Sequence, residues 1–133
     1  MSNLGTVRVL VIDDEAPIRD TCIESLESAG YRAEGYERGE AALEALADQR
    51  PDLLLVNWRL PGFLDGVEIA RRARRLQPDL RIVMITGDAS AVAGRALGAG
   101  VLQVLQKPFT GETLVATVRG VIGDSATGSG AVQ

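Results

Sequence analysis

Five polar residues of this sequence each stand at the end of a short apolar run. They are Asp13, Asp14, Asn57, Thr86 and Lys107. Brought together, the two adjacent carboxylates and the single amine would form an acidic pocket that holds one ammonium group. Lys107 supports this interpretation, because the other 13 of the 14 basic residues are arginine and a lone lysine favours a site that needs a compact ammonium.

The composition excludes several other kinds of site. Histidine is absent, which removes histidine triads, histidine metal ligands and phosphohistidine chemistry. The single cysteine, Cys22, excludes an internal disulfide and any metal site built from several cysteines, and its place on an apolar helical stripe predicts a small buried hydrophobe. The net charge of −4 and the pI of about 4.8 argue against nucleic-acid binding.

Hydrophobic periodicity predicts the elements that position these residues. Short β-branched and leucine runs between turn residues predict strands, and apolar residues three and four apart predict helices. The predicted strands are 7–12, 31–36, 52–57, 80–86 and 102–106. The predicted helices are 17–29, 40–48, 65–76, 90–99 and 110–122.

Strands that alternate with helices predict a parallel sheet covered by helices on both faces. The carboxyl ends of its strands share one edge, which is where open α/β sheets bind ligands. Four strand ends contribute polar residues there, and this is more specific than any single motif. No apolar run approaches the ~18 residues of a membrane helix, and the N-terminus lacks a signal-peptide pattern. A soluble cytoplasmic protein is therefore predicted.

At these residues the chain resembles the receiver domain of bacterial two-component response regulators. The matching segments are 11–15 (Val-Ile-Asp-Asp-Glu), 51–62 (Pro-Asp-Leu-Leu-Leu-Val-Asn-Trp-Arg-Leu-Pro-Gly), 65–66 (Asp-Gly), 85–87 (Ile-Thr-Gly) and 106–109 (Gln-Lys-Pro-Phe). The resemblance implies a flavodoxin-like, doubly wound, five-stranded parallel sheet of strand order 2-1-3-4-5 with five helices. The receiver domain is expected at 1–124, and the Gly- and Ser-rich composition of 125–133 predicts a flexible tail or the start of a linker.

The resemblance assigns the phosphoacceptor position to Asn57. Family members have an aspartate there, whose carboxylate takes a phosphoryl group from a kinase or a small acyl phosphate. Asp13, Asp14, the residue at position 57 and the backbone carbonyl of Arg59 correspond to the Mg²⁺ site. An amide has no anionic oxygen and cannot form an acyl phosphate, so we expect a chain that does not accept phosphate and binds Mg²⁺ weakly.

Three further positions complete the implied site. Thr86 would bond a phosphoryl oxygen, Lys107 would pair with the acceptor and then with its phosphate, and Pro108 would follow in a cis peptide bond. Val104 is a second departure, because the family usually has Tyr or Phe at this switch position. That ring turns inward when the threonine engages phosphate, and valine cannot make this movement.

Asn57 has two interpretations. It is either the natural residue of a pseudo-receiver or an engineered change in an ordinary phosphorylatable receiver. The otherwise intact pocket fits the second, whereas Val104, a separate loss, favours the first. A rival from another class is a small phosphotransferase or phosphatase of similar topology. That chemistry usually needs Asp-x-Asp, and here Glu15 stands two residues after Asp13.

The expected function is protein interaction in a phosphorelay rather than catalysis. The implied partners are a sensor histidine kinase or a phosphotransfer protein, and a downstream signalling protein that binds the face made by the fourth helix, the last strand and the fifth helix. Neither nucleic acid nor a membrane is expected as a partner, and a homodimer is left open.

Overall fold

The computed structural model describes residues 6–127. Strands and helices alternate along this part of the chain as β1 (Arg8–Ile12), α1 (Ala16–Ser28), β2 (Arg32–Tyr36), α2 (Gly39–Gln49), β3 (Leu53–Asn57), α3 (Gly66–Leu76), β4 (Arg81–Thr86), α4 (Ala89–Gly98), β5 (Gln103–Gln106) and α5 (Gly111–Thr127). The strands pair in parallel in the order β2-β1-β3-β4-β5. The predicted doubly wound sheet with five helices is confirmed.

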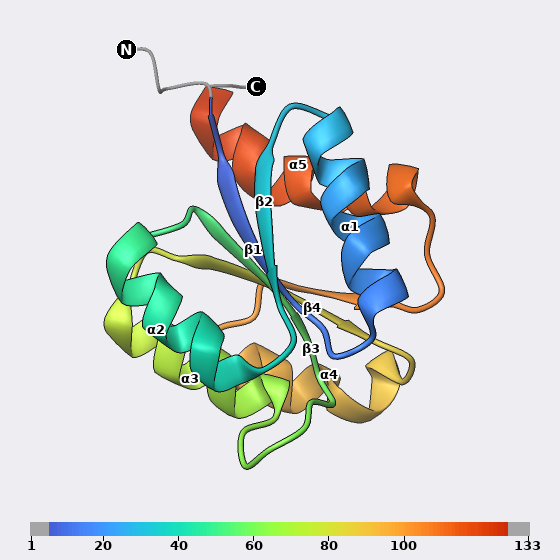
Figure 1. Ribbon diagram of the computed structural model, residues 1–133. Helices are drawn as coiled ribbons and strands as arrows, with labels where there is room; N and C mark the ends of the chain where they lie inside the picture. The colour runs from blue at the N-terminus through green and yellow to red at the C-terminus, as the bar shows by residue number, and fades with distance from the viewer. Residues whose placement is uncertain (1–5, 128–133) are drawn as a thin grey trace.

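The helices cover both faces of the sheet. Figure 1 shows α1 and α5 on one face and α2, α3 and α4 on the other. Successive strand residues point to opposite faces, so the inner strands must be apolar on both sides. In β1, Val9 and Val11 pack toward α1 and α5, whereas Leu10 and Ile12 pack toward α2, α3 and α4.

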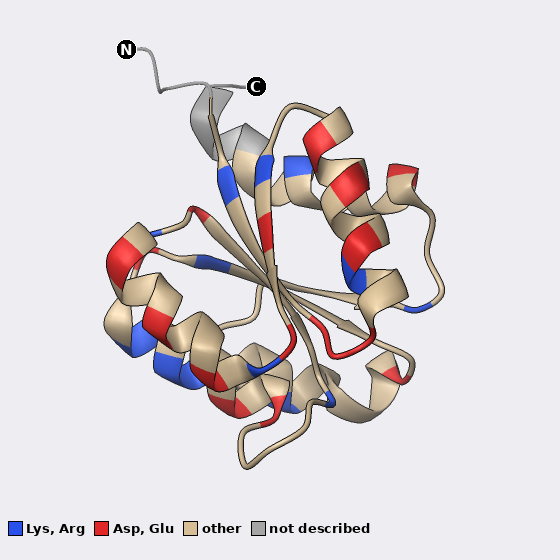
Figure 2. Ribbon diagram, in the orientation of Figure 1, with Lys and Arg blue, Asp and Glu red and all other residues tan. Residues whose placement is uncertain are grey.

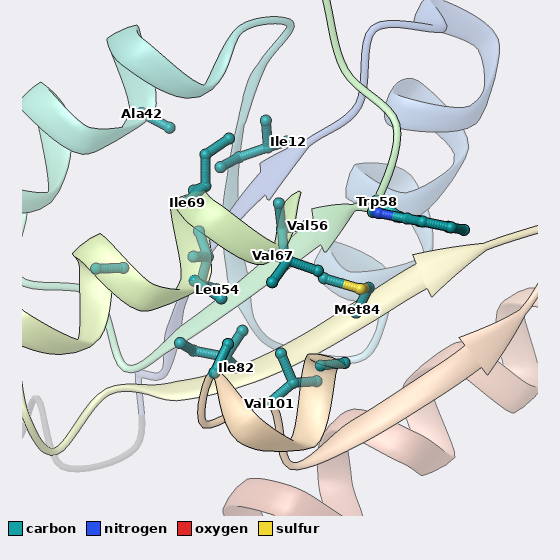
Figure 3. Close-up of a cluster of buried hydrophobic side chains, with 14 of the residues drawn as sticks. Ile12, Ala42, Leu54, Val56, Trp58, Val67, Ile69, Ile82, Met84 and Val101 are labelled. Atoms are coloured by element: carbon teal, nitrogen blue, oxygen red, sulfur yellow. The ribbon is translucent and has the colours of Figure 1, made fainter. Parts of the chain in front are cut away.

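The core has one cluster of buried residues on each face of the sheet, and the larger cluster lies under α2, α3 and α4. Figure 3 shows Leu54, Val56, Ile82 and Met84 of the sheet packed with residues of these helices, among them Ile69. Trp58, which follows β3 directly, belongs to the same cluster. The apolar core therefore reaches the carboxyl edge of the sheet, where the polar residues begin.

Polar side chains begin two of the helices. Asp65 precedes α3 and its Oδ1 accepts the Glu68 N–H at 3.0 Å. Thr110 precedes α5 and its Oγ1 accepts the Thr113 N–H at 3.0 Å. These bonds satisfy N–H groups that have no partner within the helix. Both helices therefore begin where the sequence predicted, with Asp65 and Thr110 as the capping residues.

The end of α5 differs from the expectation. The helix continues to Thr127, so residues 125–127 extend it and do not begin the tail. The remainder of the predicted tail, 128–133, lies outside the described residues. Among the helices of residues 6–127, none combines the length and the apolar character needed to cross a membrane.

Candidate functional site

Polar residues gather at the carboxyl edge of the sheet, where backbone pairing continues just beyond the strands. The Asp13 N–H donates to the Tyr36 carbonyl at 3.1 Å, and the Lys107 N–H donates to the Thr86 carbonyl at 2.7 Å. These hydrogen bonds hold the backbone of Asp13 and Lys107 in place, and so they also position the side chains of these two residues. A cavity of about 410 Å³ is lined by Asp14, Glu15, Asn57, Arg59, Thr86, Gly87, Asp88 and Lys107.

Asp13 is fully buried, and both of its carboxylate oxygens have partners. Oδ1 accepts the Glu15 N–H at 2.9 Å, and Oδ2 accepts from Lys107 Nζ at 3.1 Å. Lys107 Nζ also lies 3.6 Å from Glu15 Oε1. A buried charge is costly unless it is paired, so the ammonium stabilises Asp13 at this depth. Within the described residues Lys107 pairs with these two acids, and not with position 57 as the resemblance implied.

The loop after β1 carries the acidic residues, and Figure 2 shows them at the end of that strand. Asp14 is exposed and faces the cavity. Arg19 of α1 fixes the loop from the other side, because its Nη1 donates to the Asp13 carbonyl at 2.7 Å. The sequence did not predict this role for Arg19.

Asn57 is nearly buried at the end of β3, with 7% of its surface exposed. Its Nδ2 donates to the Arg59 carbonyl at 2.8 Å, which is the carbonyl that the resemblance assigns to the metal. A carboxylate has no hydrogen to donate there, so this bond depends on the amide. Gly66, the first residue of α3, packs directly against the backbone of Asn57. A Cβ at position 66 would collide with the Asn57 carbonyl oxygen.

Thr86 is buried at the end of β4, and its Oγ1 accepts the Asp88 N–H at 3.1 Å. Val104 pairs with Met84 in the register of β4 and β5 and packs, half-buried, on the cluster under α2, α3 and α4. The peptide bond between Lys107 and Pro108 is cis, which is the isomer that the resemblance implies.

Trp58 links the site to α4. Its ring is buried, and two guanidinium groups lie over it, with the Arg59 Cζ 4.2 Å and the Arg95 Cζ 5.1 Å from the ring centroid. Such cation–π contacts are favourable at these distances. Arg95 comes from the exposed side of α4, and no periodicity in the sequence indicated the contact.

Cys22 lies buried on α1, as its helical spacing predicted. Burial raises the pKa of its thiol to about 11, the Asp13 charge adds to the rise, and the Lys107 charge opposes it. The thiol is therefore neutral at physiological pH, and it packs in the core between the sheet, α1 and α5.

The oxygen donors do not fit a tightly held metal ion. In residues 6–127, no three His, Cys, Asp or Glu side chains are placed to hold one. Asp14 offers a free carboxylate, but both Asp13 oxygens are engaged and the Arg59 carbonyl accepts the Asn57 amide. Mg²⁺ favours near-octahedral anionic oxygen, and this arrangement supplies little of it.

The family model described as the response regulator receiver domain matches residues 9–119. The chain belongs to this family. The receiver domain is 38% identical over 119 residues to phosphate regulon transcriptional regulatory protein PhoB of Pseudomonas aeruginosa, an alignment that covers 86% of this chain and 51% of the relative. It is 39% identical over 120 residues to response regulator MprA of Mycobacterium ulcerans, with 88% and 50% covered. It thus spans about half the length of these relatives.

Solved structures agree with this assignment. The receiver domain protein of Methanospirillum hungatei matches with a TM-score of 0.86 at 26% identity, covering 93% of this chain and 99% of that one. Chemotaxis protein CheY4 of Vibrio cholerae matches with a TM-score of 0.83 at 28% identity, covering 88% and 99%. The resemblance stated from the sequence motifs is confirmed at the level of the family and the fold.

Proposed function

We propose that this receiver domain works in two-component signalling as a protein-interaction module that does not accept phosphate. The observation that carries the proposal is the neutral amide of Asn57 at the end of β3. An acyl phosphate forms when an anionic carboxylate oxygen bonds phosphorus and the leaving group departs with its electron pair. The amide offers no such oxygen, so the proposed function includes neither phosphotransfer nor other catalytic turnover.

The contacts around Asn57 support a site that is complete without phosphate. The Asn57 Nδ2 and the Arg59 carbonyl satisfy one another, and Lys107 is engaged by Asp13 and Glu15. Hydrogen bonds and ion pairs among buried polar groups favour one arrangement of those groups. We infer that the pocket keeps one resting conformation and that signalling depends on the surfaces around it.

The proposed function does not require a bound metal ion. Asp13, Asp14, the Asn57 amide oxygen and the Arg59 carbonyl are the donors that Mg²⁺ would meet. Asp13 and the Arg59 carbonyl are already engaged, and of the two donors without a partner among the described residues only Asp14 carries a charge. We therefore propose weak Mg²⁺ binding, well below that of a receiver with a third carboxylate at position 57.

The proposed partners are a sensor histidine kinase or a phosphotransfer protein at the site edge, and a downstream signalling protein on the face made by α4, β5 and α5. This face has exposed apolar side chains, with Leu97 of α4 73% exposed and Leu102, just before β5, 54% exposed. Neighbouring exposed apolar residues are typical of interaction sites. A homodimer through the same face and a cytoplasmic location remain predictions, and neither nucleic acid nor a membrane is proposed as a partner.

The decisive experiment is incubation with acetyl phosphate and Mg²⁺, followed by intact mass measurement. The native chain should gain no phosphoryl group. The Asn57→Asp variant should gain one, because its carboxylate oxygen can bond phosphorus as acetate leaves. Adding Asp14→Asn to that variant should reduce the gain, since it removes the exposed carboxylate of the pocket.

Phosphoryl transfer to Asn57 of the unsubstituted chain would overturn the proposal. Refusal of phosphate by the Asn57→Asp variant would contradict the assignment of the loss to Asn57 alone. It would show that the pocket has lost more than its acceptor, and it would remove the support for an engineered change in an ordinary receiver. The codon at position 57 of the native gene decides between a natural and an engineered asparagine.

A further inference from the structure

Gln106, the last residue of β5, lies on the surface with its whole amide group engaged. Its Nε2 donates to the Gly87 carbonyl at 2.7 Å and to the Lys107 carbonyl at 3.0 Å. Its Oε1 accepts the Ala89 N–H at 2.9 Å. Both amide hydrogens are therefore used. Fixing a flexible exposed side chain costs conformational entropy, so these three bonds must together outweigh that cost.

Two of the three bonds reach the chain between β4 and α4: one is to Gly87 in the loop and one is to Ala89, the first residue of α4. Gly87 and Ala89 lie on either side of Asp88, whose side chain makes no hydrogen bond that caps α4. The first N–H groups of a helix need an acceptor from outside the helix. Gln106 Oε1 supplies it for Ala89, so β5 caps α4 from a neighbouring element.

Besides the contact of Arg95 with Trp58, α4 is anchored by only two buried residues of its own. It contains Gly94 in its interior, it has no acidic residue in its first turn, and its buried residues are Val92 and Ala96. Glycine destabilises a helix interior relative to alanine. Elements with few buried contacts open most readily, so the cap from Gln106 matters more here than on a well-anchored helix.

The same loop belongs to the candidate site. Thr86 is the register partner of Gln106, its Oγ1 accepts the Asp88 N–H, and its carbonyl accepts the Lys107 N–H. Gln106 therefore holds both ends of a short segment whose middle is held by the Thr86 hydroxyl.

We propose that Gln106 is a positioning residue that couples the loop of Thr86 to α4 and so sets the position of the α4–β5 surface. Val104 supplies no aromatic ring for this task, and the Gln106 amide makes the connection with three hydrogen bonds. The importance of this coupling for signalling rests on the proposed function. The coupling itself is a property of the isolated chain.

Amide hydrogen exchange of the native chain and the Gln106→Met variant tests this proposal. Methionine keeps the approximate length of glutamine but donates and accepts almost nothing. Exchange at Ala89 and through the first turn of α4 should become about tenfold faster, the effect expected for the net loss of a hydrogen bond or slightly more. Exchange in α1 and α2 should not change.

Gln103→Met is the matched control. Gln103 is an exposed glutamine at the other end of β5, and its side chain bonds no other residue in the described part of the chain. This variant should exchange like the native chain. Equal acceleration of α4 in both variants, or none in Gln106→Met, would overturn the proposal.

A double-mutant cycle separates coupling from a merely local loss of stability. Thr86→Val removes the acceptor for the Asp88 N–H and should accelerate exchange in α4. In the Gln106→Met background the same change should have a clearly smaller effect, because coupled sites are not additive. Additive effects would contradict the coupling. The cycle uses neither phosphate nor a kinase, so its failure is distinct from failure of the proposed function.

Discussion

Replacing Asn57 with aspartate would exchange an amide hydrogen for a negative charge at the centre of the site. In the native chain the Nδ2 group donates to the Arg59 carbonyl at 2.8 Å, and only 7% of the residue's surface is exposed. A carboxylate would instead place an oxygen against that carbonyl oxygen. Water has little access to screen the two, so the metal-free variant should be less stable than the native chain.

Two contributions set the size of this loss. The missing hydrogen bond is worth about 1 kcal/mol. A third carboxylate near Asp13 and Asp14 adds repulsion, which the Lys107 ammonium partly offsets, since its side chain is 17% exposed and adjoins Asp13. We expect a total loss of about 2 kcal/mol near pH 7, an ordinary size for a single substitution. Toward pH 4 the new carboxyl takes up a proton and can donate as the amide does, so the difference should narrow.

Urea unfolding followed by the fluorescence of Trp58, the single tryptophan, measures both proteins with and without Mg²⁺. The metal should restore much of the variant's stability because it binds the folded state, and it should change the native chain little. Gln103→Glu is the matched control, an amide-to-acid change at an exposed site. Its free energy of unfolding should differ from the native value by less than about 0.5 kcal/mol.

The reasoning fails under either of two results. A variant at least as stable as the native chain without metal would show that the Asn57 amide contributes nothing through the Arg59 carbonyl. Equal stabilisation of both proteins by Mg²⁺ would show that position 57 does not decide the affinity of the cation.

Three further outcomes are expected. Titration of native Trp58 fluorescence with Mg²⁺ should show no sub-millimolar binding; such binding, if lost in Asp14→Asn, would confirm the site but contradict its weakness. Gly66→Ala should destabilise the fold by about 2 kcal/mol, because the new Cβ meets the Asn57 carbonyl. Gly94→Ala, which has open space around it, should stabilise the fold by about 0.5–1 kcal/mol. Equal urea unfolding midpoints for the two variants would contradict both expectations. Burial raises the pKa of the Cys22 thiol from 9.0 to about 11, so the unfolded chain loses its thiol proton first as the pH rises. Stability should fall by roughly 2–3 kcal/mol between these pH values, and pH-dependent unfolding of Cys22→Ala should lack this component.

The sequence predicted the sheet because its signals are local. Leu53 to Val56 is apolar at every position, which is typical of a strand covered on both faces, and Asn57 follows at the strand end where the structure places it. The partner of Lys107 could not be predicted in the same way. Its side chain reaches Asp13 across 94 positions of sequence, and the choice between that carboxylate and position 57 depends on the geometry of two loops.

The contacts of three long polar side chains were not predicted from the sequence. Arg19, Arg95 and Gln106 each reach a group on another element, and no periodicity distinguishes them from solvated surface residues. Gln106 and Gln103 look equivalent in the sequence, as two glutamines on one edge strand. Only the position of the β4–α4 loop over one end of β5 gives Gln106 its three bonds.

Asp13 and Asp14 support different conclusions about the pocket. Asp13 is buried and Lys107 is partly buried beside it. Removing one partner of a buried pair typically costs about 3–5 kcal/mol, because the other charge is left uncompensated, so each residue of this pair has a structural reason to be kept once the other is present. Asp14 is different, because it is exposed and its side chain makes no hydrogen bond or ion pair with any described residue. The structure gives Asp14 no role in holding the fold, so the remaining affinity of this pocket for a cation should depend on Asp14 first.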